Sequence, residues 1–339
     1  MSPASSATSA VTIENLRVTF AGGAAPVRAV NNVSLRVTRG ETVALIGESG
    51  SGKSVTLRSL LRLHPAKKTQ MSGQIEVGGR DVMAMNASEL AAFRGRVASM
   101  IFQEPLLALD PVYSVGDQII ESIQRHMKVS RSEAHARALK LFEQVRIPSP
   151  ERRLAAYPHE MSGGMRQRVM IALALACEPE LLLADEPTTA LDATVQIQIL
   201  LLLRELQSRL GLSIIFVTHD IGAAVEVADR IAVMYAGEIV EEADVRTLMR
   251  APRHPYTQAL LQSRAHGSLA KGTRLATIGG APPDLANLPP GCAFAPRCVH
   301  VEPACREGSI AIAALGPTHQ ARCRRTHEIV WQHPAAAKA

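Results

Sequence analysis

The sequence predicts an α/β fold with a parallel sheet, and three observations support it. Residues 42–46 and 181–184 are short, mainly aliphatic runs, which is the composition of buried parallel strands. A helix-like pattern follows each run, at 54–63 and at 194–210. From about residue 166, helix and strand patterns alternate, as they do in parallel α/β sheets. Because 47% of residues are hydrophobic and only 3% aromatic, the expected core is aliphatic.

The N-terminal part predicts strands of another kind. Residues 1–10 are rich in Ser and Ala, and we expect a disordered tail there. Residues 11–46 alternate apolar and polar side chains, with glycines at positions suited to turns. This pattern predicts an antiparallel β-region that leads into the strand at 42–46.

A glycine-rich loop joins that strand to the helix at 54–63. It matches G-x-x-x-x-G-K-[ST], the P-loop pattern that binds nucleotide phosphates in a strand–loop–helix context. Its glycines let backbone N–H groups face an anion at a helix N-terminus. Lys53 adds a positive charge, and the Ser54 hydroxyl is a hard oxygen ligand suited to Mg²⁺. The alternative is a Gly/Ser-rich surface loop. The predicted nucleotide-binding residues of this P-loop are Gly47, Glu48, Ser49, Gly50, Ser51, Gly52, Lys53 and Ser54.

Between about residues 105 and 160 the pattern becomes helical. Apolar residues at intervals of three and four predict helices over 115–127 and 132–145. Ser130 and Glu133 have the spacing of a capping box at the start of the second helix. Residues 194–210 predict a further long helix that ends at Gly211.

Two adjacent carboxylates end the apolar run at 181–184. Since side chains alternate along a strand, we expect Asp185 and Glu186 to point in different directions. Asp185 can then hold a Mg²⁺ ion, while Glu186 polarises the water that attacks the γ-phosphate, as a general base. The alternative is a structural, salt-bridged pair of carboxylates.

Further motifs make a family resemblance specific. The run Met-Ser-Gly-Gly-Met at 161–165 resembles the signature motif of ATP-binding cassette (ABC) ATPases, with Met in place of the usual first Leu and last Gln. Gln103 is similar to the Q-loop glutamine, and Asp192 to the D-loop aspartate. His219, at the end of a predicted strand, resembles the switch histidine. The motifs occur once each, in the order of the family, over roughly residues 11–250, so the chain resembles a single cassette.

The resemblance implies the ABC ATPase fold for residues 11–250. That fold has a RecA-like parallel-sheet core, an antiparallel β-subdomain and a helical subdomain, which falls here at about 105–165. The family stacks an aromatic side chain on adenine, and Phe20 is our candidate because stacking requires a flat π face. The alternative is a Phe that packs in the core.

The resemblance also implies roles for the motif residues. Glu186, His219 and Gln103 are the implied catalytic group, and Gln103 joins Ser54 and Asp185 around Mg²⁺. A second nucleotide half-site is implied at the signature and D-loop, because a hydroxyl and bare amides at a helix start can bind phosphate. Its residues are Ser162, Gly163, Gly164 and Asp192.

Beyond residue 251 the composition shifts toward Pro and Gly. The runs His-Pro-Tyr-Thr at 254–257 and Pro-x-Gly-Cys-x-Phe-x-Pro-Arg-Cys at 289–298 closely resemble the C-terminal extension of ATPase subunits from oligopeptide, dipeptide and nickel importers. We therefore expect a small Cys-containing extension at 251–330, followed by a tail at 331–339.

Four of the five cysteines lie in this extension. In a cytosolic protein, clustered cysteines favour a metal over disulfides. Their spacing lacks the close pairs of structural zinc sites. Four thiolates can hold a [4Fe–4S] cluster, as in some members of the resembled family. An iron–sulfur cluster is the prediction, and zinc and free thiols remain alternatives. The ligands would be Cys292, Cys298, Cys305 and Cys323.

The charge pattern argues against a nucleic-acid partner, and the hydropathy argues against a membrane-spanning segment. The net charge is +6, but basic and acidic residues are interleaved, which is typical of a solvated surface and not of a nucleic-acid-binding arm. No apolar stretch approaches the ~20 residues of a membrane span, and no signal peptide is visible. We expect a peripheral protein at the cytoplasmic face of the cell membrane, held there by membrane subunits.

The resemblance implies the ATP-hydrolysing motor of an importer for peptides or related small solutes. Its substrate and metal would be ATP and Mg²⁺. Its partners would be a second, non-identical ATPase subunit, two transmembrane permease subunits, and an extracytoplasmic solute-binding protein that acts through the permeases. The alternatives are a subunit of a phosphonate-metabolism complex, and a DNA-repair or translation ATPase.

Overall fold

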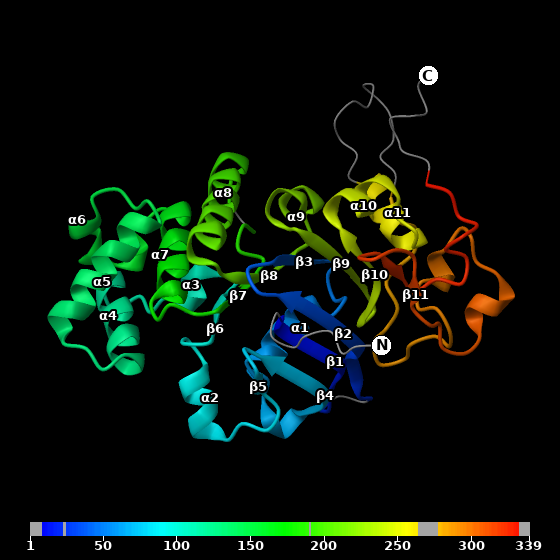
Figure 1. Cartoon of the computed structure of the whole chain (residues 1–339), viewed down its shortest axis with the longest axis horizontal. Helices are drawn as coiled ribbons and strands as arrows, with labels where there is room; N and C mark the ends of the chain where they lie inside the picture. Colours follow the sequence, from blue (N-terminus) through cyan, green and yellow to red (C-terminus); the bar gives the residue numbers. More distant parts are fainter. Residues whose placement is uncertain (1–8, 23–24, 190, 264–276, 332–339) are drawn as a thin grey trace.

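The computed structural model describes residues 9–22, 25–189, 191–263 and 277–331 (Figure 1). The remaining parts of the expected tails, 1–8 and 332–339, lie outside the described residues. Ser9 and Ala10, which the sequence placed in the N-terminal tail, belong to the first strand instead. Ser9 pairs with Thr38, and Ala10 is buried beneath the sheet. Strand pairing therefore orders this end of the chain.

The main sheet has eight strands, in the order β11-β12-β10-β9-β3-β8-β7-β6. Its central strands are parallel, as predicted, and their side chains are almost all buried. They are β3 (Thr42–Ile46), β6 (Ala98–Ile101), β7 (Leu181–Asp185), β8 (Ser213–Thr218) and β9 (Arg230–Tyr235). One edge continues with antiparallel strands from the C-terminal part of the chain. They are β10 (Glu238–Asp244), β11 (Ala313–Ala314) and β12 (Gln320–Ala321).

A second, antiparallel sheet has the strand order β2-β1-β4-β5. Its strands are β1 (Ser9–Phe20), β2 (Val27–Thr38), β4 (Thr69–Val77) and β5 (Arg80–Asp81). The inward faces of β1 and β2 share one apolar core with α1 and the main sheet, and this core contains Leu16, Val33, Leu45 and Leu57. The alternating pattern in the sequence thus corresponds to one buried face of this sheet.

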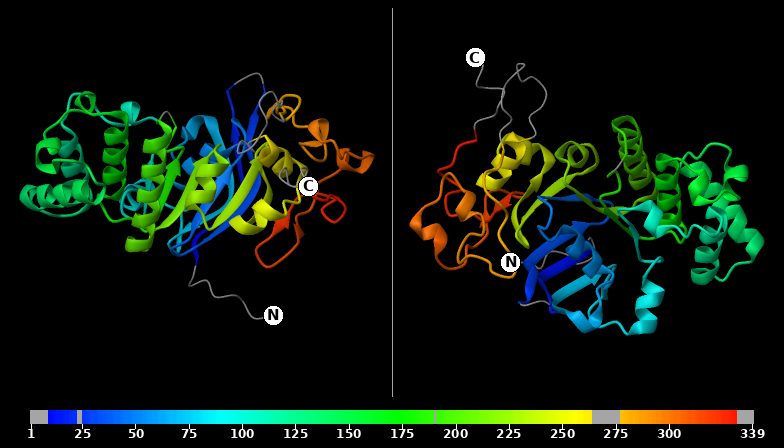
Figure 2. Two further views of the ribbon diagram at one scale, coloured as in Figure 1. Left: turned by 90° about the horizontal axis from the view of Figure 1, so that it is seen from above. Right: turned by 180° about the vertical axis from the view of Figure 1, so that it is seen from behind.

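Helices cover the other face of the main sheet and form a lobe beside it (Figures 1 and 2). Near the sheets lie α1 (Lys53–Leu60), α2 (Ala87–Phe93), α8 (Ala193–Leu210), α9 (Ile221–Val227), α10 (Val245–Arg250) and α11 (Pro255–Gln262). The lobe contains α3 (Pro105–Ala108), α4 (Val115–His126), α5 (Arg131–Gln144), α6 (Pro150–Leu154) and α7 (Gly163–Leu175). Short 3₁₀ turns lie at Ala66–Lys68, Pro158–Glu160, Ala295–Arg297 and Pro303–Arg306.

The helix ends follow local signals in the sequence. Ser130 and Glu133 form the predicted capping box of α5, in which each side chain accepts from the other residue's backbone N–H. Gly211 ends α8 in the left-handed conformation, with a φ of 66°. The parallel sheet, the antiparallel sheet and the helical lobe together confirm the predicted fold class.

The extension beyond α10 packs against the β10 edge of the main sheet, on the side opposite the helical lobe (Figure 2). Strand β12 pairs with β10 through Glu241 and Glu242. Among the described residues, no helix is long and apolar enough to cross a membrane.

Candidate functional site

The P-loop lies between β3 and α1, in close contact with its neighbours. Gly47 has a φ of +152° and Gly52 a φ of +101°, which side chains other than glycine rarely allow. A Cβ atom on Gly47 would lie 2.2 Å from the carbonyl oxygen of Met234. One on Gly52 would lie 2.4 Å from the carbonyl oxygen of Ala29. The two glycines therefore let the loop pass directly against β9 and β2.

Lys53, the first residue of α1, is folded into the loop and is only 4% exposed. Its Nζ donates to the carbonyl oxygens of Gly47, at 2.8 Å, and Glu48, at 2.9 Å. Burial lowers the pKa of Lys53, and the carboxylates of Glu186 and Asp185 act in the opposite direction. The ammonium group thus lies inside the concave loop, where an anionic ligand would meet it.

Ser54 and Asp185 bring two hard oxygen atoms together beside this ammonium. Ser54 Oγ donates to Asp185 Oδ1 at 2.6 Å, and Arg58 lies 3.5 Å from Asp185 Oδ2. Asp185 is fully buried, and burial raises the pKa of its carboxyl group. One hydroxyl and one guanidinium at 3.5 Å offset the charge of this buried carboxylate only in part, so a cation bound nearby would stabilise it.

This pair suits Mg²⁺ bound together with a nucleotide. Protein sites for Mg²⁺–nucleotide complexes supply one or two protein oxygens, and water and phosphate complete the octahedron. In the described part of the chain, no group of three or more His, Cys, Asp or Glu side chains could hold a metal ion. Ser54 and Asp185 do not need such a group, because the phosphates supply the other ligands.

The other two predicted catalytic side chains, His219 and Gln103, both contact Glu186. Its Oε2 lies 3.1 Å from Nδ1 of His219 and 3.4 Å from Nε2 of Gln103. Thr189, which the sequence did not indicate, donates to the same oxygen at 2.9 Å. Glu186 does not continue the strand, because β7 ends at Asp185 and Glu186 has a φ of +48°. Asp185 and Glu186 do contact different partners, as expected, but the cause is a left-handed backbone at Glu186 and not alternation along a strand.

The signature residues lie at the start of α7 and face the start of α8. The Ser162 side chain caps α7 by accepting from Met165 N–H at 3.3 Å. Asp192 caps α8 by accepting from Val195 N–H at 2.9 Å. A Cβ on Gly164 would lie 2.7 Å from Val195 Cγ1. Within the described ranges, no hydrogen bond or ion pair joins these residues to the P-loop.

Phe20 lies at the end of β1 and is partly buried. Its ring meets His64 edge-on, with ring centroids 5.4 Å apart. Both the stacking role and the core role predicted for Phe20 remain predictions.

The four cysteines of the extension line one small cavity of about 20 Å³. Cys292 N–H donates to the carbonyl oxygen of Cys305 at 2.8 Å. Burial raises the pKa of the Cys292, Cys298 and Cys323 thiols, which favours their neutral form. The thiols converge as expected, but among the described residues they do not form a ready-made site for a metal ion.

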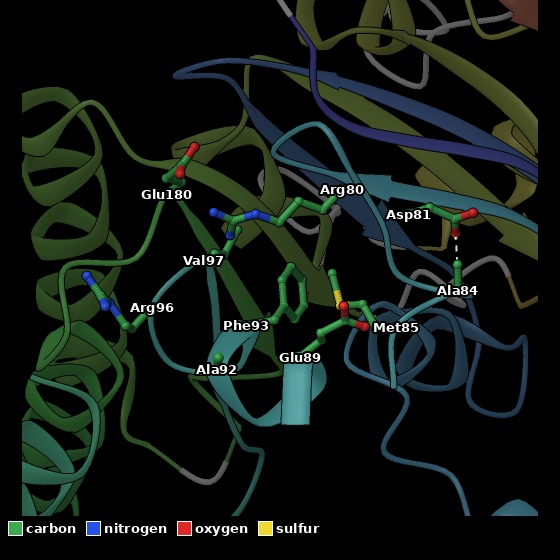
Figure 3. Close-up of a pocket in the computed structure, with 10 residues that line it drawn as sticks. All are labelled: Arg80, Asp81, Ala84, Met85, Glu89, Ala92, Phe93, Arg96, Val97 and Glu180. Carbon is green, nitrogen blue, oxygen red and sulfur yellow. Dashed lines mark hydrogen bonds between the residues drawn. The ribbon is translucent and has the colours of Figure 1, made fainter. Parts of the chain in front are cut away.

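A separate open hollow of about 700 Å³ lies beside β5 and α2 (Figure 3). Arg80, Arg96, Asp81 and Glu180 line it together with Phe93, so charges of both signs face the space. It contains none of the predicted site residues, and we assign it no part in the nucleotide site.

Two residues of the extension contact the P-loop without having been predicted to do so. Arg297 forms an ion pair with Glu48 at 2.7 Å, and the Tyr256 hydroxyl accepts from Glu48 N–H at 2.8 Å. Their only signal in the sequence was their position in the runs at 254–257 and 289–298, which resemble an importer extension.

Comparisons with known proteins identify the family. A family model described as "ABC transporter" matches residues 30–189. A second, "Oligopeptide/dipeptide transporter, C-terminal region", matches residues 240–305. The dipeptide transport ATP-binding protein DppD of Bacillus subtilis is 46% identical over 85% of this chain and 86% of its own length. The oligopeptide transport ATP-binding protein OppD of Mycobacterium tuberculosis is 46% identical over 96% of this chain, which covers 53% of that protein.

A solved structure, a dimeric ATP-binding cassette in a post-hydrolysis state bound to ADP and phosphate, superposes with a TM-score of 0.62. It is 31% identical and covers 70% of this chain and 99% of its own. The chain thus matches both an ABC transporter family model and the model of an importer C-terminal region. The chain belongs to the family of ABC transporter ATP-binding proteins, in the branch that carries the oligopeptide/dipeptide transporter C-terminal region.

Proposed function

We propose that this chain is the ATP-hydrolysing motor subunit of an ABC importer that takes up di- or oligopeptides or related small solutes. One observation carries the proposal. Gln103 and His219 converge on the Glu186 carboxylate, next to a P-loop whose Lys53 and Ser54 are in place for phosphate and Mg²⁺. The similarity to DppD and OppD supports peptides as the solute.

The P-loop is the proposed seat of the β- and γ-phosphates. Lys53 exchanges its carbonyl contacts for phosphate oxygens, and the backbone N–H groups of residues 47–54 supply further donors. Ser54 and Asp185 would hold Mg²⁺, and Gln103 would complete its shell. When bound, Mg²⁺ neutralises phosphate charge.

Hydrolysis is the proposed task of Glu186. A carboxylate beside the γ-phosphate can polarise the attacking water and accept its proton. His219 and Gln103 lie on the same carboxylate oxygen, so they can orient it and respond to the γ-phosphate. Thr189 donates to that oxygen as well and fixes the rotamer of Glu186.

The second half-site is proposed to act on a nucleotide held by another ATPase subunit. Ser162, Gly163, Gly164 and Asp192 lie at the starts of two helices, where backbone N–H groups attract anions. A head-to-tail pair of cassettes brings this half-site of one subunit to the P-loop of the other. We propose a non-identical ATPase as the partner. Closure on ATP and opening after hydrolysis then form a two-state, ligand-biased change.

The proposed docking surface for the two permease subunits is a groove beside Gln103. It has a volume of about 490 Å³ and lies among β6, α4 and α7, with Phe102 and Tyr113 in its lining. Leu106, Leu107 and Val112, which are 60%, 81% and 70% exposed, extend the apolar surface next to it. A contiguous apolar surface of this kind marks a protein interface. Docking there would hold the chain at the cytoplasmic face of the membrane and link Gln103 to the permeases.

The proposed domain division follows the same functions. Residues 11–250 form the ATPase, with the helical subdomain at about 105–165, and residues 251–330 form the extension.

A [4Fe–4S] cluster is our proposal for the four cysteines, supported by the convergence of four thiols on one cavity. Protein purified without oxygen should then be brown, and Ser at any of the four positions should bleach it. Colourless protein with stoichiometric zinc would assign zinc instead. Four titratable thiols without metal would discard the centre.

The transport proposal is tested by purification and reconstitution. The chain should copurify from membranes with two multi-span proteins, and vesicles containing the complex should accumulate a labelled dipeptide only with ATP. A complex in which this chain carries Glu186→Gln is the matched control and should not accumulate it. Copurification with ribosomes or DNA, in place of membrane proteins, would favour a non-transport ATPase.

A further inference from the structure

We propose that the C-terminal extension sets the affinity of the P-loop for ATP, because Arg297 neutralises the charge of Glu48. This inference rests on the nucleotide site proposed above at residues 47–54. The extension would then influence nucleotide binding through two contacts with Glu48 of the P-loop, one from Arg297 and one from Tyr256.

The first contact is a two-pronged ion pair. Arg297 Nη1 lies 2.7 Å from Glu48 Oε2, and Nη2 lies 3.0 Å from Glu48 Oε1. The Arg297 side chain is only 4% exposed and that of Glu48 26%, so solvent screens the pair weakly. Parallel N–H···O bonds of this kind fix geometry as well as charge.

Arg297 is itself held in place by further hydrogen bonds. Its Nε donates to the carbonyl oxygen of Gly279 at 2.8 Å, and Nη2 also donates to that of Ile278 at 3.3 Å. The Tyr235 hydroxyl accepts from Nη1 at 3.2 Å. The guanidinium is thus oriented by the extension and by β9 before any ligand is present.

The second contact holds the backbone at the same residue. Tyr256, at the start of α11, is fully buried, and its hydroxyl accepts from Glu48 N–H at 2.8 Å. Its ring packs against Tyr235, with centroids 4.5 Å apart, and against Phe294, at 5.4 Å. The extension therefore holds both the main chain and the side chain of Glu48 through one aromatic cluster.

The negative charge of Glu48 affects ATP binding, because ATP is also an anion. The Glu48 carboxylate acts on Lys53 electrostatically, as do Asp185 and Glu186. Without Arg297, the carboxylate would repel the polyphosphate and compete with it for Lys53. With Arg297 in place, the pair is neutral and Lys53 remains available. Arg297 is therefore a positioning residue, which acts on the nucleotide through Glu48.

The test is a series of charge-neutralising and charge-conserving variants of the full-length chain, with ATP affinity measured by titration of a fluorescent ATP analogue. Arg297→Ala should raise Kd roughly tenfold, the size of a typical coupling between neighbouring sites. Arg297→Lys keeps the cation and loses the fork, so its Kd should rise less than about threefold. Adding Glu48→Gln to Arg297→Ala should restore Kd to within about threefold of wild type, because the unpaired anion is gone.

Arg325→Ala is the matched control. Arg325 forms an ion pair with Glu302 at 2.8 Å inside the same extension, and among the described residues it forms no hydrogen bond or ion pair with the P-loop, so Kd should not change. An Arg297→Ala chain with the Kd of wild type would overturn the inference while the nucleotide site stands. A double variant as weak as Arg297→Ala would overturn it too, since packing and not charge would be the cause. If Arg297→Ala fails to fold, the Lys variant and the double variant still decide. A wild-type chain that binds no ATP would refute the nucleotide site itself.

Discussion

Glu186 and Asp185 are neighbours in the chain, but they lie in different surroundings. Glu186 has three side chains on one oxygen and is 15% exposed, whereas Asp185 is fully buried beside Ser54. We expect Glu186→Gln to leave ATP binding nearly unchanged and to lower turnover by about 10²- to 10⁴-fold, because an amide cannot accept the proton of the attacking water. Phosphate release by the assembled complex measures this.

The control for that prediction is Glu205→Gln. Glu205 lies on the outer face of α8 and pairs with Arg146, away from the P-loop. Its turnover should equal that of wild type. Near-wild-type turnover of Glu186→Gln would remove Glu186 from the catalytic role.

Asp185 gives a prediction on stability with a definite sign. Folding raises the pKa of Asp185, so above this raised pKa the charged carboxylate lowers the free energy of unfolding. Asp185→Asn should therefore raise the melting temperature of the nucleotide-free chain at neutral pH, by roughly 2 to 4 °C for a gain of about 1 kcal/mol. The difference should vanish as the pH falls through the raised pKa and wild-type Asp185 takes up its proton.

For Asp117→Asn we expect the opposite effect on the melting temperature. The Ser114 hydrogen bond and the Arg131 pair lower the pKa of Asp117, so its charge stabilises the fold above its unfolded pKa. This variant should melt lower than wild type at neutral pH. Calorimetry from pH 4 to 8 checks both, and equal shifts for the two variants would contradict the argument.

At the scale of the element, α7 and α8 approach each other closely at Gly164, in the signature motif, and Val195. A methyl group on Gly164 would lie 2.7 Å from Val195 Cγ1, whereas one on Gly163 would lie 3.7 Å from Leu191. Gly164→Ala should therefore lower the free energy of unfolding by about 1 to 3 kcal/mol through overpacking. Gly163→Ala should raise it by up to about 1 kcal/mol, since Ala favours a helix. Urea unfolding compares the two, and equal effects would contradict the predicted clash.

Elements with local signals could be predicted from the sequence. Residues 115–126 and 131–144 are helical because apolar spacing and the Ser114 and Ser130 caps act within a few positions. The parallel strands at 42–46 and 181–185 followed from their apolar composition, whereas those at 98–101 and 230–235 were not predicted. The left-handed backbone that directs Glu186 could not be predicted, because the strand ends one residue before it. Periodicity does not reveal such a break.

At the scale of the whole molecule, the proposed catalytic residues and the proposed signature half-site are separate. Because Ser162–Gly164 make no bond to the P-loop within the described ranges, we expect the isolated chain to be a weak ATPase. Activity should rise when the proposed second ATPase and the proposed permease subunits are added, because each would complete what the chain lacks. A stable monomer whose high activity per subunit does not change with concentration would contradict this expectation.

Ion pairs between residues far apart in the chain could not be predicted from the sequence. Glu41 meets Arg230 at 2.8 Å, and Glu241 accepts from Arg253 N–H and pairs with His319. Nothing in the spacing of these residues specifies a partner far along the chain. The cysteines could be foreseen as one group because their residue type is rare and clustered, but their exact arrangement depends on the packing of the whole extension.

The pair between Glu48 and Arg297 also has a consequence for the order of events during synthesis. The two residues are 249 positions apart, and the loop emerges from the ribosome long before its partner does. At roughly 5 to 20 residues per second, Glu48 waits on the order of 10 to 50 s for Arg297. During that interval the nascent chain has its P-loop, but Glu48 lacks the cation that neutralises its carboxylate. By the inference above, the P-loop of the nascent chain should bind nucleotide more weakly until Arg297 has been made and pairs with Glu48.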